Sequence, residues 1–237
     1  MHERIIDLFE KFYPNYSGED SLFESHVRDS LRDVSVVLDA GCGSGSMAGH
    51  DFRQKDRLVV GVDVGHDIKE NPTLTQGVCG RLELLPFKDR SVDLILCRYV
   101  LEHIEEPWAT FGEFRRVLRD NGKIVVLTPN LWHYVTCISR IAPWWFHRWF
   151  NTSNGISEKD TFKTFYRANT RRRIARLARE AGLRVGRVEM IETSPNYLEF
   201  SRLCYRFGVG YERVVNRLPL LKWARVNMVA TLVKSKI

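Results

Sequence analysis

Two short apolar segments of the sequence each end in an aspartate, and the first of them runs directly into alternating glycines. Residues 36–38 are apolar and precede Asp39, and residues 41–45 then carry glycine at every second position. Residues 58–62 are apolar or glycine and precede Asp63, eighteen residues after the last of these glycines. Glycine lets the main chain turn sharply and lets a ligand approach it closely, and a carboxylate accepts hydrogen bonds from a ribose. The pattern therefore predicts a nucleotide site at the ends of two neighbouring strands.

The spacing of the glycines separates two kinds of nucleotide. A dinucleotide-binding turn requires G-x-G-x-x-G, which would place glycine at position 46, where this chain has Ser46. The observed D-x-G-x-G-x-G pattern from Asp39 to Gly45 resembles instead the first motif of class I S-adenosylmethionine (SAM)-dependent methyltransferases. The spacing therefore disfavours a nicotinamide dehydrogenase.

Three later segments resemble the type 11 group of these methyltransferases. Residues 80–87 are similar to its G-D-A-x-x-L-P-F segment, and residues 92–107 to its F-D-x-V-x-x-x-x-V-L-E-H-x-x-x-P signature. Residues 123–130 resemble its strand that ends in T-P-N. The matches cover about residues 34–130 in the family's order. The resemblance implies SAM as the cofactor and a small-molecule methyltransferase, as in ubiquinone biosynthesis.

The resemblance also implies which residues contact the cofactor. In that group the acid of the G-D-A segment accepts a hydrogen bond from the adenine amino group. Here Arg81 stands in its place, and arginine cannot accept a hydrogen bond, whereas the main-chain N–H of Leu82 remains available to adenine. The predicted cofactor-binding residues are Asp39, Gly41, Cys42, Gly43, Gly45, Asp63, Val64, Arg81, Leu82, Cys97 and Arg98.

His103 is the predicted catalytic base. Methyl transfer from a sulfonium is an in-line displacement, so orientation supplies most of the catalysis and no metal is required. A hydroxyl acceptor must lose its proton, which histidine takes well near neutral pH. His103 lies just past the predicted fourth strand, residues 91–97. A packing or capping role for it fits the sequence equally well, and Glu102 beside it is either a cap or an orienting partner.

The predicted fold is α/β, a Rossmann-like sheet of seven mostly parallel strands flanked by helices. Helices are expected at residues 3–13 and 20–32, at 111–118 before a stop at Asn121-Gly122, and after the N-cap Thr170. The expected strands are residues 36–39, 58–63, 74–79, 91–97, 123–130, 183–193 and 227–233.

The chain is expected to form one domain, residues 1–237, which contains regions with three different roles. Residues 1–33 form N-terminal lid helices, residues 34–130 form the SAM-binding core, and residues 131–170 and 194–225 form insertions that cap the substrate. The predicted substrate-binding residues are Tyr16, Trp144, Trp145, Tyr166 and Arg167.

Charge is distributed unevenly along the sequence. Residues 1–130 hold 16 Lys and Arg against 22 Asp and Glu, whereas residues 131–237 hold 20 against 7. A basic second half points to an anionic partner, and a solvated arginine-rich face is the alternative.

Aromatic residues accompany these cations, at Trp132, Trp144, Trp145 and Trp149 and between residues 197 and 225. We expect a small-molecule or lipid-like anionic acceptor and peripheral contact with an anionic membrane. The aromatic residues could instead form the core of the cap. Nucleic acid is a less favoured partner, because clustered tryptophans suit it less well than isolated stacking rings. An RNA methyltransferase and a non-catalytic SAM-binding scaffold remain the alternative functions.

Cysteine content and hydropathy suggest the compartment. The five cysteines include no C-x-x-C pair, which indicates neither a disulfide framework nor a zinc site. The charged start of the sequence is unlike a signal peptide, and no uncharged run reaches the roughly 20 residues of a membrane span. We therefore expect a cytoplasmic protein, with a peripheral position at the inner membrane face as an extension. Oligomeric state has no signal in the sequence.

Overall fold

A computed structural model of the chain describes residues 5–16, 18, 20–45, 51–141 and 163–236. The chain falls into two compact units, each built from three segments. The sheet unit consists of Phe23–Thr128, Thr164–Glu189 and Met228–Ile237, and the helical unit consists of Met1–Leu22, Pro129–Lys163 and Met190–Asn227. Every position predicted to bind the cofactor lies in the sheet unit.

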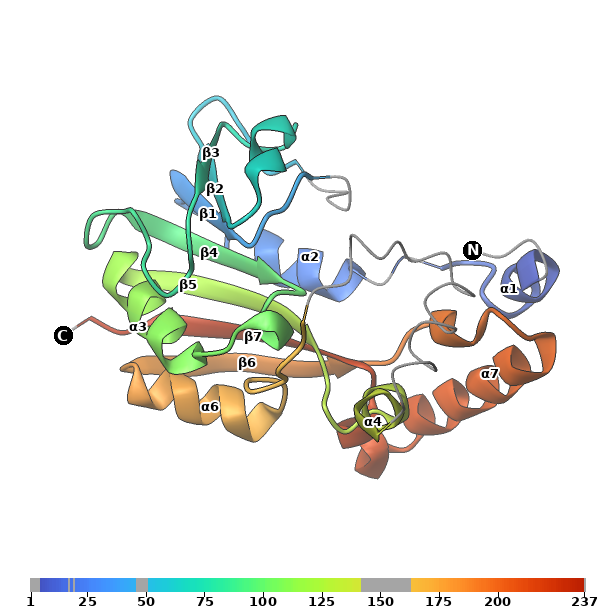
Figure 1. Ribbon diagram of the computed structural model, residues 1–237. Coiled ribbons are helices and arrows are strands. Elements are labelled where there is room, and N and C mark those ends of the chain that lie inside the picture. The colour runs from blue at the N-terminus through green and yellow to red at the C-terminus, as the bar shows by residue number, and fades with distance from the viewer. Residues whose placement is uncertain (1–4, 17, 19, 46–50, 142–162, 237) are drawn as a thin grey trace. The chain divides into compact units, whose positions relative to one another are not determined.

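The sheet has seven strands in the order β3-β2-β1-β4-β5-β7-β6 (Figure 1). The four pairs among β1 to β5 are parallel. The predicted seven-stranded, mostly parallel sheet is therefore confirmed. The strands are β1 (Val36–Ala40), β2 (Leu58–Asp63), β3 (Gln76–Cys79), β4 (Val92–Arg98), β5 (Leu118–Pro129), β6 (Leu183–Ile191) and β7 (Asn227–Lys234).

The register of the parallel strands brings the predicted cofactor residues to the same side of the sheet, where the strands have their carboxyl ends. Asp39 lies beside Gly61 of β2 on one side and beside Leu96 of β4 on the other. Asp63 and Arg98 each lie two residues beyond those partners, at the carboxyl ends of their strands. In an open parallel sheet this edge is where ligands bind.

The interior strands are buried because both faces of a parallel sheet are normally covered. Residues 124–127 of β5 form a continuous apolar run with no exposed surface, and Leu94 and Ile95 of β4 are equally buried. β7 is antiparallel to β5. The Nζ of Lys234 at the end of β7 donates to the main-chain oxygen of Leu118 at the start of β5, at 2.7 Å.

Several helices accompany the sheet. They are α2 (Ser21–Arg28), η2 (His66–Glu70), η3 (Leu101–His103), α3 (Pro107–Val117) and α6 (Arg171–Glu180). The predicted N-cap of α6 is confirmed, because the Thr170 hydroxyl accepts from the N–H of Arg173 at 3.2 Å. α2 lies against the sheet through His26, whose Nδ1 is 2.8 Å from the Thr231 hydroxyl in β7.

The region before β5 differs from the prediction. Asn121-Gly122 was expected to stop the preceding helix, but α3 ends at Val117 and the strand begins at Leu118. The pairing with β4 jumps from Val92 beside Leu118 to Leu94 beside Lys123, so the intervening residues form a bulge. Asn121 takes a left-handed conformation with φ of 65°, which asparagine tolerates better than most residues.

The helical unit contains α1 (Ile6–Phe12), α4 (Tyr134–Ile141), η5 (Asn196–Leu198), α7 (Arg202–Arg217) and η6 (Pro219–Ala224). Its core forms where Ile5 and Leu8 pack against Tyr205 and Val209. The Arg202 guanidinium adds a bidentate ion pair, with 2.7 Å from each terminal nitrogen to a carboxylate oxygen of Asp7. These contacts join α1 to α7 across the length of the sequence.

The domain assignment stays a prediction, because the contacts within each unit do not test it. The same holds for the lid role of residues 1–33, although the hydrogen bond of His26 to β7 gives α2 a structural task in the sheet unit. Among the described residues, no helix is both long and apolar enough to cross a membrane.

Arg116 of α3 holds the segment that carries the predicted adenine contact. Its guanidinium donates to the main-chain oxygens of Leu85 and Phe87 at 2.9 and 2.7 Å. It also bonds the Glu113 carboxylate, which in turn accepts from the N–H of Leu85 at 2.7 Å. A second acid, Asp89, accepts at 2.8 Å.

We predict that Arg116→Ala lowers the free energy of unfolding by about 1–3 kcal/mol, because it leaves main-chain oxygens and a half-buried carboxylate without their donor. Urea unfolding would measure the change. Arg172→Ala, at an exposed position of α6, is the matched control and should change stability by less than about 0.5 kcal/mol. Equal effects of the two substitutions would contradict this role.

Candidate functional site

The turn after β1 is tightly packed at its first residue, Gly41, and open around Gly43. Gly41 has φ of +77°, and a Cβ at this position would collide with Val100, so only glycine fits both the conformation and the space. Its N–H donates to the main-chain oxygen of Val62 in β2 at 2.7 Å. At Gly43 no atom of the described residues beyond its two chain neighbours lies within 4 Å of the place a Cβ would take. The main chain at the centre of the turn therefore faces open space.

Asp63 connects the end of β2 to this turn. One carboxylate oxygen accepts from the N–H of Gly43 and the other from the N–H of Gly65, both at 2.9 Å. A carboxylate has about four lone-pair positions, so each oxygen can accept a further hydrogen bond. The structure thus fixes the orientation of the group while it keeps acceptor capacity for the two hydroxyls of a ribose.

Asn71 holds the turn from the carbonyl side. Its Nδ2 donates to the main-chain oxygens of Cys42 and Gly43, each at 3.2 Å. Its Oδ1 accepts from the N–H and the hydroxyl of Thr73, at 3.0 and 2.7 Å. The amide of Asn71 therefore connects the glycine turn to Thr73 in the segment after η2.

Asp39 has an unusual electrostatic position. Loss of hydration on burial raises the pKa of its carboxyl to about 6, while Arg98 lowers that pKa and the Asp63 carboxylate raises it further. Because parallel strands bring three charged side chains to one edge, their charges interact there. The site consequently presents two carboxylates and one guanidinium beside the open turn.

The remaining predicted cofactor residues differ in how accessible they are. Val64 is exposed directly after β2, whereas Leu82 is buried. Cys97 has no exposed surface, and its contact with the cofactor stays a prediction. The Arg81 side chain is exposed and lies 3.5 Å from the Glu83 carboxylate, and so it does not take the place of the acid that it replaces in the motif.

In open α/β sheets the helix that follows such a turn presents free N–H groups to the ligand. Residues 46–50 lie outside the described part of the chain, and residues 51–57 before β2 are turn and bridge with no helix. Among the described residues, the donors at this edge therefore come from the turn itself.

A buried carboxyl joins three segments beyond the end of β4. Glu102 is 4% exposed, and its Oε2 accepts from the Thr128 hydroxyl at 3.1 Å. That hydroxyl accepts in turn from Nδ2 of Asn169 at 2.6 Å. The main-chain oxygen of Glu102 accepts from the N–H groups of Phe165 and Tyr166, at 2.7 and 3.1 Å. Burial raises the pKa of Glu102 to about 7, although hydrogen bonds from its own N–H and from Thr128 oppose this.

His103, the predicted base, is the half-buried last residue of η3, five residues past the end of β4. Two predicted substrate contacts lie in the segment that Glu102 binds. Tyr166 is half-buried with φ of 51°, and the exposed Arg167 donates to the main-chain oxygen of Glu105 at 2.6 Å. Their roles toward substrate stay predictions.

The other predicted substrate contacts lie in the helical unit. Tyr16 packs edge-on against Phe9, with ring centroids 5.2 Å apart, and against Tyr13 at 5.9 Å. Trp144 and Trp145 fall outside the described residues. Tyr16 is thus a member of an aromatic cluster, and its predicted role toward substrate stays open.

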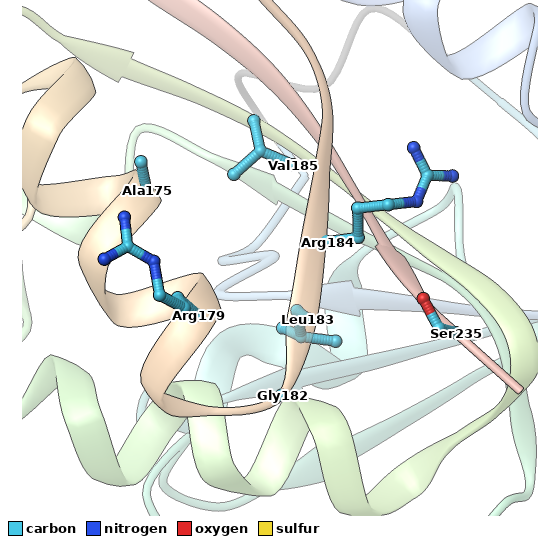
Figure 2. A pocket seen from close by; sticks show the side chains of 7 residues that line it. All are labelled: Ala175, Arg179, Gly182, Leu183, Arg184, Val185 and Ser235. Carbon is cyan, nitrogen blue, oxygen red and sulfur yellow. The ribbon is translucent and has the colours of Figure 1, made fainter. Parts of the chain in front are cut away.

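The surface hollow shown in Figure 2 lies at the opposite edge of the sheet from the cofactor residues. It is lined by Leu183 at the start of β6 and by Ser235 just after the end of the antiparallel β7, with Arg179 and Arg184 beside them. Within the described residues, no group of three or more His, Cys, Asp or Glu side chains could hold a metal ion.

Two residues that organise the site were not identified from the sequence. Asn71 precedes a proline and resembles an ordinary turn residue, and Asn169 precedes the N-cap of α6. Their partners lie 28 and 41 residues away along the chain. The T-P-N segment was the only local signal, because it contains Thr128.

Comparison with known proteins finds a family that matches part of the chain. Residues 38–126 match the family described as Methyltransferase domain. An uncharacterised protein of Methanocaldococcus jannaschii is 35% identical over 143 residues, which are 54% of this chain and 62% of that protein. The malonyl-acyl-carrier-protein O-methyltransferase of Yersinia pestis is 30% identical over 97 residues, 39% of this chain and 36% of the relative. The chain thus spans less than two thirds of the length of these relatives.

A similar fold occurs in the geranyl diphosphate C-methyltransferase of Streptomyces coelicolor, whose structure contains Mg²⁺, geranyl diphosphate and S-adenosylhomocysteine. The TM-score is 0.55 at 15% identity, and the alignment covers 91% of this chain and 77% of the other. At this identity the likeness concerns the fold alone.

The raised pKa of Glu102 predicts how the stability of the folded chain depends on pH. Its pKa is about 7 in the folded chain and near 4.5 when unfolded, so folding favours the protonated form. The stability this provides is complete below about pH 4.5 and is lost as the pH rises through 7. Glu102→Gln mimics the neutral form. Its free energy of unfolding should therefore equal that of the parent near pH 4.5 and exceed it at pH 8 by up to about 3 kcal/mol. Urea unfolding at several pH values measures the difference, and a difference independent of pH would contradict the buried neutral carboxyl.

Proposed function

We propose that residues 38–126, which match the Methyltransferase domain family, form a SAM-dependent methyltransferase domain that methylates a small-molecule or lipid-like anionic acceptor at oxygen. One observation carries the cofactor side of this proposal. The main chain at Gly43 faces open space, and Asp63 keeps acceptor capacity directly beside it. A nucleoside can approach the main chain there and bond through its ribose hydroxyls.

The residues of this edge have distinct tasks in the proposal. Asp63 accepts from the ribose hydroxyls, and the main-chain N–H of Leu82 donates to adenine. Asn71 keeps the turn in its binding conformation before the ligand arrives, which reduces the entropy lost on binding. Bound SAM supplies an electrophilic methyl group. The chain then has to orient the acceptor, because orientation accounts for much of the rate of such a displacement.

His103 takes the proton from the acceptor hydroxyl. Its position after β4 places it beyond the same edge of the sheet as the carboxyl end of β1. Glu102 supports it indirectly, since the main chain of Glu102 is fixed through hydrogen bonds to Phe165 and Tyr166. A positioned base typically contributes 10²–10⁴-fold to such a rate.

Two relatives support an anionic acceptor. The Yersinia pestis relative is an O-methyltransferase named for a malonyl carrier, and the Streptomyces coelicolor fold neighbour is named for geranyl diphosphate. The first supports oxygen as the target, and the second supports a lipid-like anion. The excess of Lys and Arg in residues 131–237 fits both kinds of acceptor.

We predict that Asp63→Ala weakens SAM binding by at least about tenfold, because it removes the acceptor of two charge-assisted hydrogen bonds. Calorimetry with SAM, with its demethylated product and with NAD measures the effect. Asp56→Ala, at an exposed position before β2, is the control and should bind SAM as the parent does. Asp63→Asn keeps one acceptor oxygen and should give an intermediate affinity. Unchanged affinity in Asp63→Ala, or tighter binding of NAD, would overturn the assignment.

His103 should be required for turnover and not for binding of the cofactor. An acceptor is first found by screening anionic metabolites and lipids for release of S-adenosylhomocysteine. His103→Ala should then lower the rate roughly 10²–10⁴-fold at unchanged SAM affinity. His66→Ala, exposed on η2, serves as the control. A full rate in His103→Ala would leave it a packing residue and favour carbon as the target.

A further inference from the structure

The outer side of α7 carries a ridge of exposed apolar side chains. Leu203, Phe207 and Val214 are 63%, 71% and 50% exposed, and Leu218 just after the helix is 48% exposed. At roughly 100° per residue these four side chains fall within about 60° of arc around the helix. The opposite side of α7 is buried in the core of the helical unit through Tyr205 and its neighbours. The ridge therefore faces away from that core.

The ridge continues past the end of α7 into η6. Leu220 is 89% exposed and Trp223 is 58% exposed. Single exposed apolar residues are ordinary on a protein surface, whereas a continuous series on two consecutive elements marks an interaction surface. We call the six side chains of this series the α7 ridge: Leu203, Phe207, Val214, Leu218, Leu220 and Trp223.

Cations accompany the α7 ridge in a regular way. All of its members except Leu220 directly follow an exposed Lys or Arg in the sequence. In α7 these cations lie on one flank of the ridge, because neighbouring residues are separated by about 100°. The five cations are Arg202, Arg206, Arg213, Arg217 and Lys222.

Acids in the same segment offset one of these cations, because the Glu212 carboxylate lies 3.3 Å from the Arg213 guanidinium. Residues 197–225 contain two acids, Glu199 and Glu212, and both are buried. Glu212 accepts hydrogen bonds from the Tyr13 hydroxyl and from Asn216, at 3.3 and 2.6 Å. Arg202 is neutralised by Asp7, whereas Arg206, Arg217 and Lys222 remain exposed with no acid within salt-bridge distance among the described residues.

We propose that the α7 ridge docks on an anionic lipid bilayer, with α7 lying parallel to the membrane surface. Removing the ridge from water requires an apolar partner, and the cations beside it require a negative one. The boundary between headgroups and acyl chains offers both at the same depth. A second copy of this chain would bring like charges together, and RNA would neutralise the cations but leave the ridge in water. The surface is independent of the cofactor residues, which lie in the sheet unit.

Vesicle co-sedimentation tests the proposal with the full chain. Vesicles of phosphatidylcholine with about 30% phosphatidylserine should bind it, and pure phosphatidylcholine should bind it at least tenfold more weakly. Leu203→Ser with Phe207→Ser should abolish binding by removing apolar contact. Arg206→Glu with Arg217→Glu and Lys222→Glu should lower binding by on the order of 100-fold, since each interfacial cation contributes about fivefold.

Matched controls separate this surface from general attraction. Leu84→Ser with Trp108→Ser removes two equally exposed apolar side chains from the sheet unit, and Arg172→Glu with Arg179→Glu and Arg184→Glu reverses three exposed arginines there. Both controls should keep nearly full vesicle binding, and thermal unfolding should confirm that all variants fold.

Four results would overturn the proposal. The first is that the parent chain does not bind vesicles, and the second is that the control variants lose as much vesicle binding as the α7 variants. The third is a dimer that Phe207→Ser dissociates. The fourth is RNA binding that the α7 charge reversals abolish while vesicle binding is unchanged.

Discussion

The hydrogen bond from the Gly43 N–H to the Asp63 carboxylate is the constraint on which the candidate site depends. It ties the turn after β1 to the end of β2, and Asn71 binds the carbonyl oxygens of the same turn. Donors and acceptors of the main chain are thus both fixed, so the turn needs little ordering when a ligand binds. The parallel register makes this possible, because it aligns the two strand ends that the bond connects.

The parts of the fold that could be predicted are those with a local signal. Apolar runs marked the strands, the first two of them ending in an acid, and the observed sheet follows them closely. The cap at Thr170 was equally local, since its partner lies three residues away. Asp39, Asp63 and the glycine turn could be placed at one edge because parallel strands must end together. Their mutual charge interactions follow from that placement.

The parts that could not be predicted depend on contacts between distant residues. Asn71 and Asn169 are polar residues in turn-like sequence, and nothing beside them shows that their partners are Gly43 and Thr128. The bulge at Asn121-Gly122 was missed for a related reason. The pair resembles a helix stop, but hydrogen bonding to β4 resumes on its far side and makes it part of β5.

Burial also decides what the uneven charge of the sequence means. A buried carboxylate must find hydrogen-bond donors, and Glu192 and Glu212 of the helical unit both have them. The side chain of Glu192 is 5% exposed and accepts from the N–H of Val226 at 2.8 Å, with Nε2 of His133 at 3.5 Å from its other oxygen. Glu212 is likewise occupied by Tyr13 and Asn216. Since these acids are used inside the unit, the cations of the same segments remain at the surface. Of the cations of this unit, Arg206, Arg217 and Lys222 are exposed, so a charged partner can reach them there.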